Sequence, residues 1–252
     1  MKFLLLFAFL IPSVHAACEV GGSVGCSVSE VCMATLQGPT CTAIPMTAPL
    51  VFNLPFDSNT EVACTHSSGI GSHSYQNAFY ALDFANNYDQ PAATILAAAD
   101  GKAFVFYGED GKPCAEPAGN PSQAEADNCG QGWGNHIKIL HQNGYYSFYV
   151  HLEKILIKNG DIIKQGQPIG VEGWTGLAGH RHLHWSVQKL PGNNAVDWEN
   201  RISWAGDSVP FQFQAIQEGK LVTLNSSQLK CAHAGLGQVP ASEQPRMKGV
   251  SK

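Results

Sequence analysis

Short β-prone runs separated by turn signals fill most of the chain after Leu50, and this pattern constrains the fold most strongly. The clearest runs are residues 94–98, 102–107, 136–141, 145–150 and 182–188. No run shows a sustained 3.6-residue period, and only 14% of residues are charged, beside 26 glycines and 14 prolines. Asn143-Gly144 tolerates positive φ and predicts a hairpin between two of the runs. We therefore predict an all-β fold of mostly antiparallel sheet.

The first 16 residues have the features of an export signal. Lys2 supplies a positive charge, an apolar run covers Phe3 to Ile11, and Val14-His15-Ala16 offers small residues for cleavage. This run is too short to cross a bilayer, which takes roughly 20 apolar residues. We therefore expect residues 1–16 to be a signal peptide and the protein to be secreted or periplasmic.

Eight cysteines follow the expected signal peptide: Cys18, Cys26, Cys32, Cys41, Cys64, Cys114, Cys129 and Cys231. An even number in an exported chain predicts disulfides rather than thiolate metal ligands. The first four lie among Gly, Ser and Thr, which predicts a small disulfide-rich lobe whose three possible pairings stay open. Cys114 and Cys129 lie in a Gly/Pro/Ala-rich insertion at 108–134, and a disulfide between them would brace it.

These features divide the chain into four expected parts. Residues 17–49 form the Cys-rich region and a linker, and residues 50–190 form the main domain. Residues 191–252 form an extension that packs on this domain, with a frayed end from 236 onward. A net charge of −5 offers no basic surface for nucleic acid or anionic membrane. We expect a monomer without nucleic acid or stable membrane partners.

The segment Gly179-His180-Arg181-His182-Leu183-His184-Trp185 carries the strongest chemical signal. Side chains at positions i and i+2 of a strand leave the same face, about 7 Å apart. His182 and His184 therefore project into one site, while Leu183 points away. This geometry suits one imidazole that ligates a metal and another that meets the substrate beside it.

Further metal ligands are expected upstream. His73 follows Gly71-Ser72, and Asp83 lies within an apolar run where an ionised carboxylate is costly unless it is paired or bound to a cation. His73, Asp83 and His184 together make three protein ligands. Three ligands leave a fourth tetrahedral position for water, as in catalytic zinc sites. Each residue taken alone has a plain structural interpretation as a loop, turn or core residue.

Ordered motifs extend this pattern over roughly residues 50–190. They are Ser72-His73, YALDF at 80–84, AADG at 98–101, Gly134-Asn135, YVHL at 149–152, GDIIKQGQPIG at 160–170, Thr175-Gly176 and HLH at 182–184. This set resembles the lysostaphin/LytM-type zinc metallopeptidases. The resemblance implies a β-sheet/barrel-sandwich hybrid fold with a zinc site at the floor of an open groove.

The resemblance also implies roles for individual residues. His73, Asp83 and His184 match the ligands of one Zn²⁺ per chain, and His151 and His182 match the catalytic pair. The implied activity is hydrolysis of peptide cross-links or bridges in bacterial peptidoglycan. Which histidine acts as general base stays open.

The chain departs from the family pattern at several positions. Phe79 stands where many members have the first histidine, so we assign that role to His73 and keep His66 as the reserve. Arg181 replaces the usual proline before HLH, and His180 is an additional histidine at the expected groove.

Two other functions stay open from the sequence. One is a non-catalytic LytM-like protein that binds the wall or activates other wall hydrolases. The other is a secreted protease that cuts Gly-rich proteins. Trp133, Trp174 and Trp185 flank the expected groove, where they would line it or pack in the core.

Overall fold

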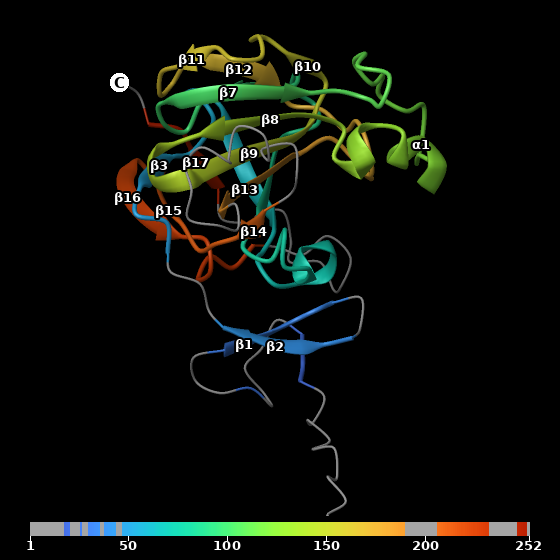
Figure 1. Cartoon of the computed structure of the whole chain (residues 1–252). Coiled ribbons are helices and arrows are strands. Elements are labelled where there is room, and N and C mark those ends of the chain that lie inside the picture. The colour runs from blue at the N-terminus through green and yellow to red at the C-terminus, as the bar shows by residue number, and fades with distance from the viewer. Residues whose placement is uncertain are drawn as a thin grey trace, which may run out of the picture.

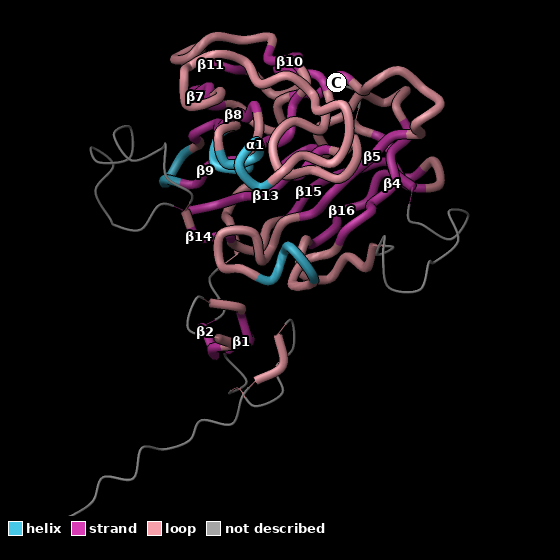
Figure 2. The backbone as a smooth tube through the Cα atoms, turned by 90° about the vertical axis from the view of Figure 1, so that its right-hand side faces the viewer, coloured by secondary structure: helices cyan, strands magenta, loops and turns pink. Residues whose placement is uncertain are grey.

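The computed structural model describes residues 18–20, 26, 30–35, 38–43, 47–189, 206–231 and 246–250. The signal peptide expected at 1–16 lies outside this part of the chain. Strands dominate the body, with few short helical segments (Figures 1 and 2). Among the described residues, no helix has the length and apolar character needed to cross a membrane.

The strands are β1 (Glu30–Met33), β2 (Thr40–Ala43), β3 (Val51–Asn53), β4 (Glu61–His66), β5 (Leu82–Asn86), β6 (Thr94–Leu96), β7 (Gly101–Phe106), β8 (Asn135–Leu140), β9 (Tyr145–Leu152), β10 (Lys154–Ile155), β11 (Ile162–Ile163), β12 (Pro168–Val171), β13 (Leu183–Lys189), β14 (Asp207–Ser208), β15 (Gln212–Gln217), β16 (Lys220–Asn225) and β17 (Arg246–Lys248). One α-helix, α1 (Gln123–Asp127), and 3-10 turns at Gly71–Ser74, Gly130–Gly132 and Gln142–Gly144 complete the described elements.

A 12-stranded sheet forms the body, with the order β11-β7-β8-β9-β13-β5-β4-β17-β15-β16; β14 pairs with β13 and β3 with β15. All the pairings are antiparallel except that of β3 with β15. A smaller sheet has the order β10-β12-β6. The prediction of a mostly antiparallel all-β fold is therefore confirmed.

The centre of the sheet is buried on both faces. In β9, Tyr145, Tyr149 and Leu152 join the main core, while Tyr146, Phe148 and Val150 form a second cluster on the opposite face. Trp185 of β13 lies at the middle of the main core, with ring centroids 4.8 Å from Phe211 and 5.5 Å from Phe213. Aromatic packing of this kind fixes the strands that carry polar side chains at their ends.

The predicted hairpin is confirmed: residues 142–144 turn between the antiparallel strands β8 and β9. The insertion at 108–134 contains α1. Ser122 caps this helix and forms a reciprocal capping box with Glu125. The expected disulfide between Cys114 and Cys129 is present.

The C-terminal part differs from expectation. Fraying from residue 236 onward is wrong for Arg246–Lys248, which form β17 between β4 and β15 in the main sheet. β14 to β17 are strands of the same sheet as β13, and a disulfide joins Cys64 of β4 to Cys231. The boundary near residue 190 stays a prediction.

The N-terminal lobe is a β1-β2 hairpin, drawn below the body in Figure 1. Disulfides Cys18–Cys32 and Cys26–Cys41 close it, which settles the open pairing. The lobe contacts the loop that precedes β5. Ala34 N donates to Ser74 O at 2.9 Å, and Met33 packs against Phe79 and Tyr80.

Replacing Met33 with alanine should lower the free energy of unfolding by about 2 kcal/mol. Met33 is only 2% exposed, and its removal would leave a cavity against the rings of Phe79 and Tyr80. Urea denaturation of the oxidised protein measures this change. The matched control is Thr40→Ala on the exposed end of the same hairpin, where we expect a change within about 0.5 kcal/mol. Equal effects of the two substitutions would show that the lobe is not packed on the body.

Candidate metal centre and catalytic groove

Three elements place the predicted metal ligands. Asp83 of β5 and His184 of β13 are directly opposite residues in the antiparallel pair, so the sheet register brings the carboxylate and the imidazole together. His73 comes from the 3-10 turn at 71–74 and reaches the same point from the loop before β5. All these side chains are buried. The convergence predicted for His73, Asp83 and His184 is therefore present in the structure.

The three ligand atoms form a nearly equilateral triangle. His73 Nε2 lies 3.0 Å from His184 Nδ1, and Asp83 Oδ1 lies 3.1 Å from each of these nitrogens. A tetrahedral zinc with ligands at about 2.0–2.1 Å would hold neighbouring ligand atoms about 3.3 Å apart. The triangle therefore has the size that a zinc ion needs.

The chemistry of these atoms also fits a cation. His73 Nδ1 donates to Ser67 O at 3.1 Å, so a neutral His73 presents a lone pair from Nε2. Burial alone would raise the pKa of Asp83, but the imidazoles of His73, His182 and His184 hold the pKa well below its ordinary value. The ionised carboxylate of Asp83 and the imidazoles of His73 and His184 are buried and face one another, and a metal ion would stabilise all three.

His151 ends β9 beside this triangle. Its φ of 65° is unusual for a residue other than glycine, and such strain is common at active sites. His151 Nδ1 donates to Thr175 O at 2.8 Å, which leaves Nε2 unprotonated in the neutral ring. Burial is the main cause that lowers the pKa of His151 well below its ordinary value. His151 is thus held as a neutral base.

Close backbone contacts between two loops fix the position of Thr175, whose carbonyl oxygen accepts from His151. A Cβ on Gly134 would lie 2.3 Å from Thr175 O, and one on Gly176 would lie 2.3 Å from Gly134 N. Both positions also have positive φ, so only glycine allows this approach. Thr175 Oγ1 donates to Leu152 O at 2.9 Å and completes the connection to the end of β9.

His182 lies just before β13 and bridges to Gly173 rather than continuing the strand. Its ring centroid is 4.9 Å from that of His151, and its Nε2 is 3.7 Å from Asp83 Oδ2. His182 Nδ1 donates to His180 O at 2.8 Å, so Nε2 is the basic nitrogen of the neutral ring. Two imidazole bases therefore flank the metal triangle.

Arg181, in place of the family's proline, anchors the segment before β13. Its Nη2 donates to Asn86 Oδ1 at 2.9 Å and to Gln90 O at 3.0 Å. Its Nε lies 3.6 Å from the buried carboxylate of Glu172, which also accepts from Asn86 N. Sequence reasoning missed Glu172, because nothing in GVEGW distinguishes it from an exposed glutamate.

A groove of about 480 Å³ opens over these groups. The lining residues that surround the histidines and Asp83 are Ser72, Tyr75, Asn77, Ala78, Gln131, Gly132, Trp133, Leu177, Ala178 and Gly179. Trp133 lines the groove as expected, whereas Trp185 is fully buried in the core. Its volume is in the range of protein clefts that bind ligands.

The reserve ligand His66 lies next to this site without joining the triangle. It pairs with Asp83 across β4 and β5, but its Nδ1 is 4.0 Å from Asp83 Oδ2. His66 Nε2 bonds to Ile70 O at 2.7 Å, and its ring centroid lies 4.2 Å from that of His73. Geometry thus favours His73 over His66 as the ligand.

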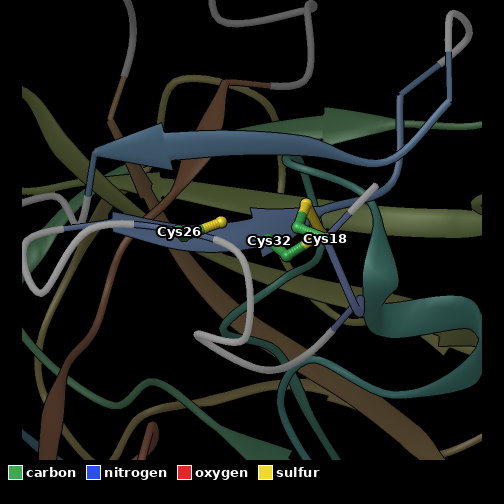
Figure 3. A group of neighbouring side chains, drawn as sticks. All are labelled: Cys18, Cys26 and Cys32. Atoms are coloured by element: carbon green, nitrogen blue, oxygen red, sulfur yellow. A yellow bond between two sulfur atoms is a disulfide. The ribbon is translucent and has the colours of Figure 1, made fainter. Parts of the chain in front are cut away.

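A second group of ligand-type atoms lies in the N-terminal lobe. Figure 3 shows Cys18, Cys26 and Cys32 close together. Cys18 is bonded to Cys32, and Cys26 to Cys41, so the oxidised lobe offers no thiolates. Among the described residues, His73, Asp83 and His184 are the remaining group of this kind.

Comparison with known proteins agrees with this geometry. Residues 78–198 match the model of peptidase family M23. This segment belongs to peptidase family M23. The M23 segment includes Asp83, His151, His182 and His184, whereas His73 lies just before it. The place of His73 in the site therefore rests on its distances to Asp83 and His184.

Related proteins match shorter parts of the chain. The peptidoglycan DD-endopeptidase ShyB of Vibrio cholerae is 44% identical over 64 residues, which cover 25% of this chain and 15% of ShyB. The murein hydrolase activator NlpD of Escherichia coli is 31% identical over 110 residues, which cover 39% of this chain and 29% of NlpD. The chain thus spans less than a third of these relatives.

Structural comparison finds the catalytic domain of lysostaphin from Staphylococcus simulans. It is 25% identical, the match covers 54% of this chain and 83% of that domain, and the TM-score is 0.35.

The disulfides of this chain, together with its family, indicate an extracytoplasmic protein.

Proposed function

We propose that this protein is a secreted or periplasmic zinc metalloendopeptidase that hydrolyses peptide cross-links or bridges in bacterial peptidoglycan. The observation that carries the proposal is the convergence of His73, Asp83 and His184 under a groove flanked by His151 and His182. A single Zn²⁺ held by the triangle would supply Lewis acidity toward the scissile carbonyl and a water molecule.

The protein's own groups would then handle the protons. His151 and His182 each have Nδ1 tied to a backbone carbonyl, which leaves Nε2 of each ring basic. One imidazole would take the proton of the attacking water, and the other would stabilise the tetrahedral species or protonate the leaving amine. The groove walls would hold the peptide in an extended form across these bases.

The similarity to NlpD supports a second candidate, a non-catalytic activator of wall hydrolases. An activator has no need of both basic imidazoles beside a complete ligand triangle, so the endopeptidase is the better-supported function. A protease acting on Gly-rich proteins would use the same site and differ only in substrate.

Digestion of purified peptidoglycan, read by mass spectrometry, tests these proposals. We expect new peptide amines and carboxylates, complete loss of their release with a chelator, and recovery with zinc. Products that form equally well in chelator would contradict metal dependence. If the protein by itself releases no products but a second wall hydrolase digests peptidoglycan faster in its presence, the protein is an activator. If it cleaves Gly-rich proteins and not peptidoglycan, it has the third function.

A further inference from the structure

A second hollow shares His180 with the groove. Its volume is about 310 Å³, and it is lined by Tyr88, Glu116, Trp174, His180 and Arg181. His180 also lines the groove, and its ring centroid lies 4.9 Å from that of His182. The hollow is therefore adjacent to the part of the groove that contains His182.

Exposed aromatic side chains form its walls. Tyr88 is 56% exposed, and Trp174 is partly exposed. Tyr88 is held in place by the Arg181 guanidinium 5.7 Å from its ring centroid and by the His180 ring at 6.1 Å. Aromatic rings exposed together beside a reaction site are typical of ligand contacts.

The inserted loop brings a carboxylate to the same place. Glu116 Oε1 accepts from Trp174 N at 3.2 Å, whereas Oε2 makes no hydrogen bond or ion pair with the described residues. The loop is held firmly nearby, because Cys114 is bonded to Cys129 and its backbone N and O both bond to the buried side chain of Asn135. Glu116 is thus fixed at the hollow with one oxygen available.

The positive charge at the hollow is already compensated. The Arg181 guanidinium lies 3.6 Å from Glu172, whose carboxylate is fully buried, and its Nη2 is saturated by acceptors on residues 86–90. Glu116 is therefore the uncompensated charge, and it stands beside two aromatic rings. Rings and a carboxylate together attract an ammonium group, and they would repel a carboxylate.

We propose that this hollow is a substrate subsite for an aliphatic side chain that ends in an ammonium group. The proposal rests on the proposed endopeptidase function and adds the class of residue that the enzyme prefers near the cleaved bond. It also gives the insertion at 108–134 a role, since this loop supplies Glu116.

A pair of cross-linked peptidoglycan peptides tests the subsite. One peptide keeps a free side-chain amine near the cleaved bond, and the other has the same amine acetylated. For the wild-type protein we expect kcat/KM to be about tenfold higher for the free amine. Glu116→Gln and Trp174→Ala should each bring this ratio close to one, because the free amine loses the contacts that favour it.

Glu109→Gln is the matched control, because it removes the same charge from an exposed position of the same loop outside the hollow. It should keep the wild-type ratio. Equal zinc-dependent cleavage of both peptides by the wild-type protein would overturn the subsite and leave the proposed function standing. A preference that survives Glu116→Gln would also overturn it. Cleavage of neither peptide would defeat the proposed function, and the subsite with it.

Discussion

Asp83→Ala should abolish stable zinc binding and lower peptidoglycan hydrolysis by at least about 10³-fold, because Lewis-acid stabilisation is worth several kcal/mol. Asp83 Oδ1 is 3.1 Å from both ligand nitrogens, so the substitution removes the only negatively charged ligand of the three. The remaining two imidazoles make a neutral, two-ligand site. Zinc content after dialysis and the rate of product release measure the two effects.

The control for this substitution is Asp89→Ala, in the exposed loop after β5. This variant should keep both zinc and activity. Zinc should also raise the unfolding temperature of the wild-type protein and of Asp89→Ala but not that of Asp83→Ala, because a ligand stabilises only the folded state that binds it. A folded Asp83→Ala protein that keeps one tightly bound zinc would refute the assignment.

His182→Ala should separate metal binding from catalysis. The expected result is one bound zinc with hydrolysis lowered by about 10²–10⁴-fold, which is the usual contribution of a positioned acid or base. His182 is not a member of the triangle, and its Nε2 lies 3.7 Å from Asp83 Oδ2 on the side of the groove. Metal analysis and steady-state hydrolysis on the same preparation give both quantities.

His180→Ala is the matched control for this second prediction, since it removes an imidazole from the same segment and the same groove. His180 is neither one of the three candidate ligands nor a member of the catalytic pair, so we expect less than about a tenfold loss of hydrolysis. Similar losses for His180→Ala and His182→Ala would point to a general disturbance of the segment. Full activity of His182→Ala would remove His182 from the catalytic pair.

The sheet and half of the metal site follow from local sequence patterns. The β-prone runs at 136–141 and 145–150 predicted β8 and β9, and Asn143-Gly144 predicted their turn. The spacing of His182 and His184 correctly placed both side chains at one site. The strand itself begins one residue later than predicted, at Leu183, because Gly173 pairs with His182 across a separate bridge.

The choice between His66 and His73 needed the folded chain. Both histidines precede β5, and no periodicity defines the turns between them. His66 is fixed by the β4 register, whereas His73 depends on a 3-10 turn that also contacts the N-terminal lobe. Such tertiary contacts leave no local signal in the sequence.

Other differences have similar causes. β17 is a strand because it pairs with β4 on one side and with β15 on the other. Its three residues have no strand pattern of their own. The helix α1 did have a signal, since Ser122 and Glu125 form the capping-box spacing, but five residues are too few to show periodicity. Folding brings Glu172 and Arg181 to 3.6 Å from each other, and no local sequence pattern predicts this contact.

X-ray absorption spectroscopy of the zinc-loaded protein tests the metal site most directly. With His73, Asp83 and His184 as ligands, we expect one zinc per chain surrounded only by nitrogen and oxygen at about 2.0–2.2 Å. Sulfur at about 2.3 Å would place the metal on cysteines instead. That result would contradict the assignment of the catalytic centre to the groove.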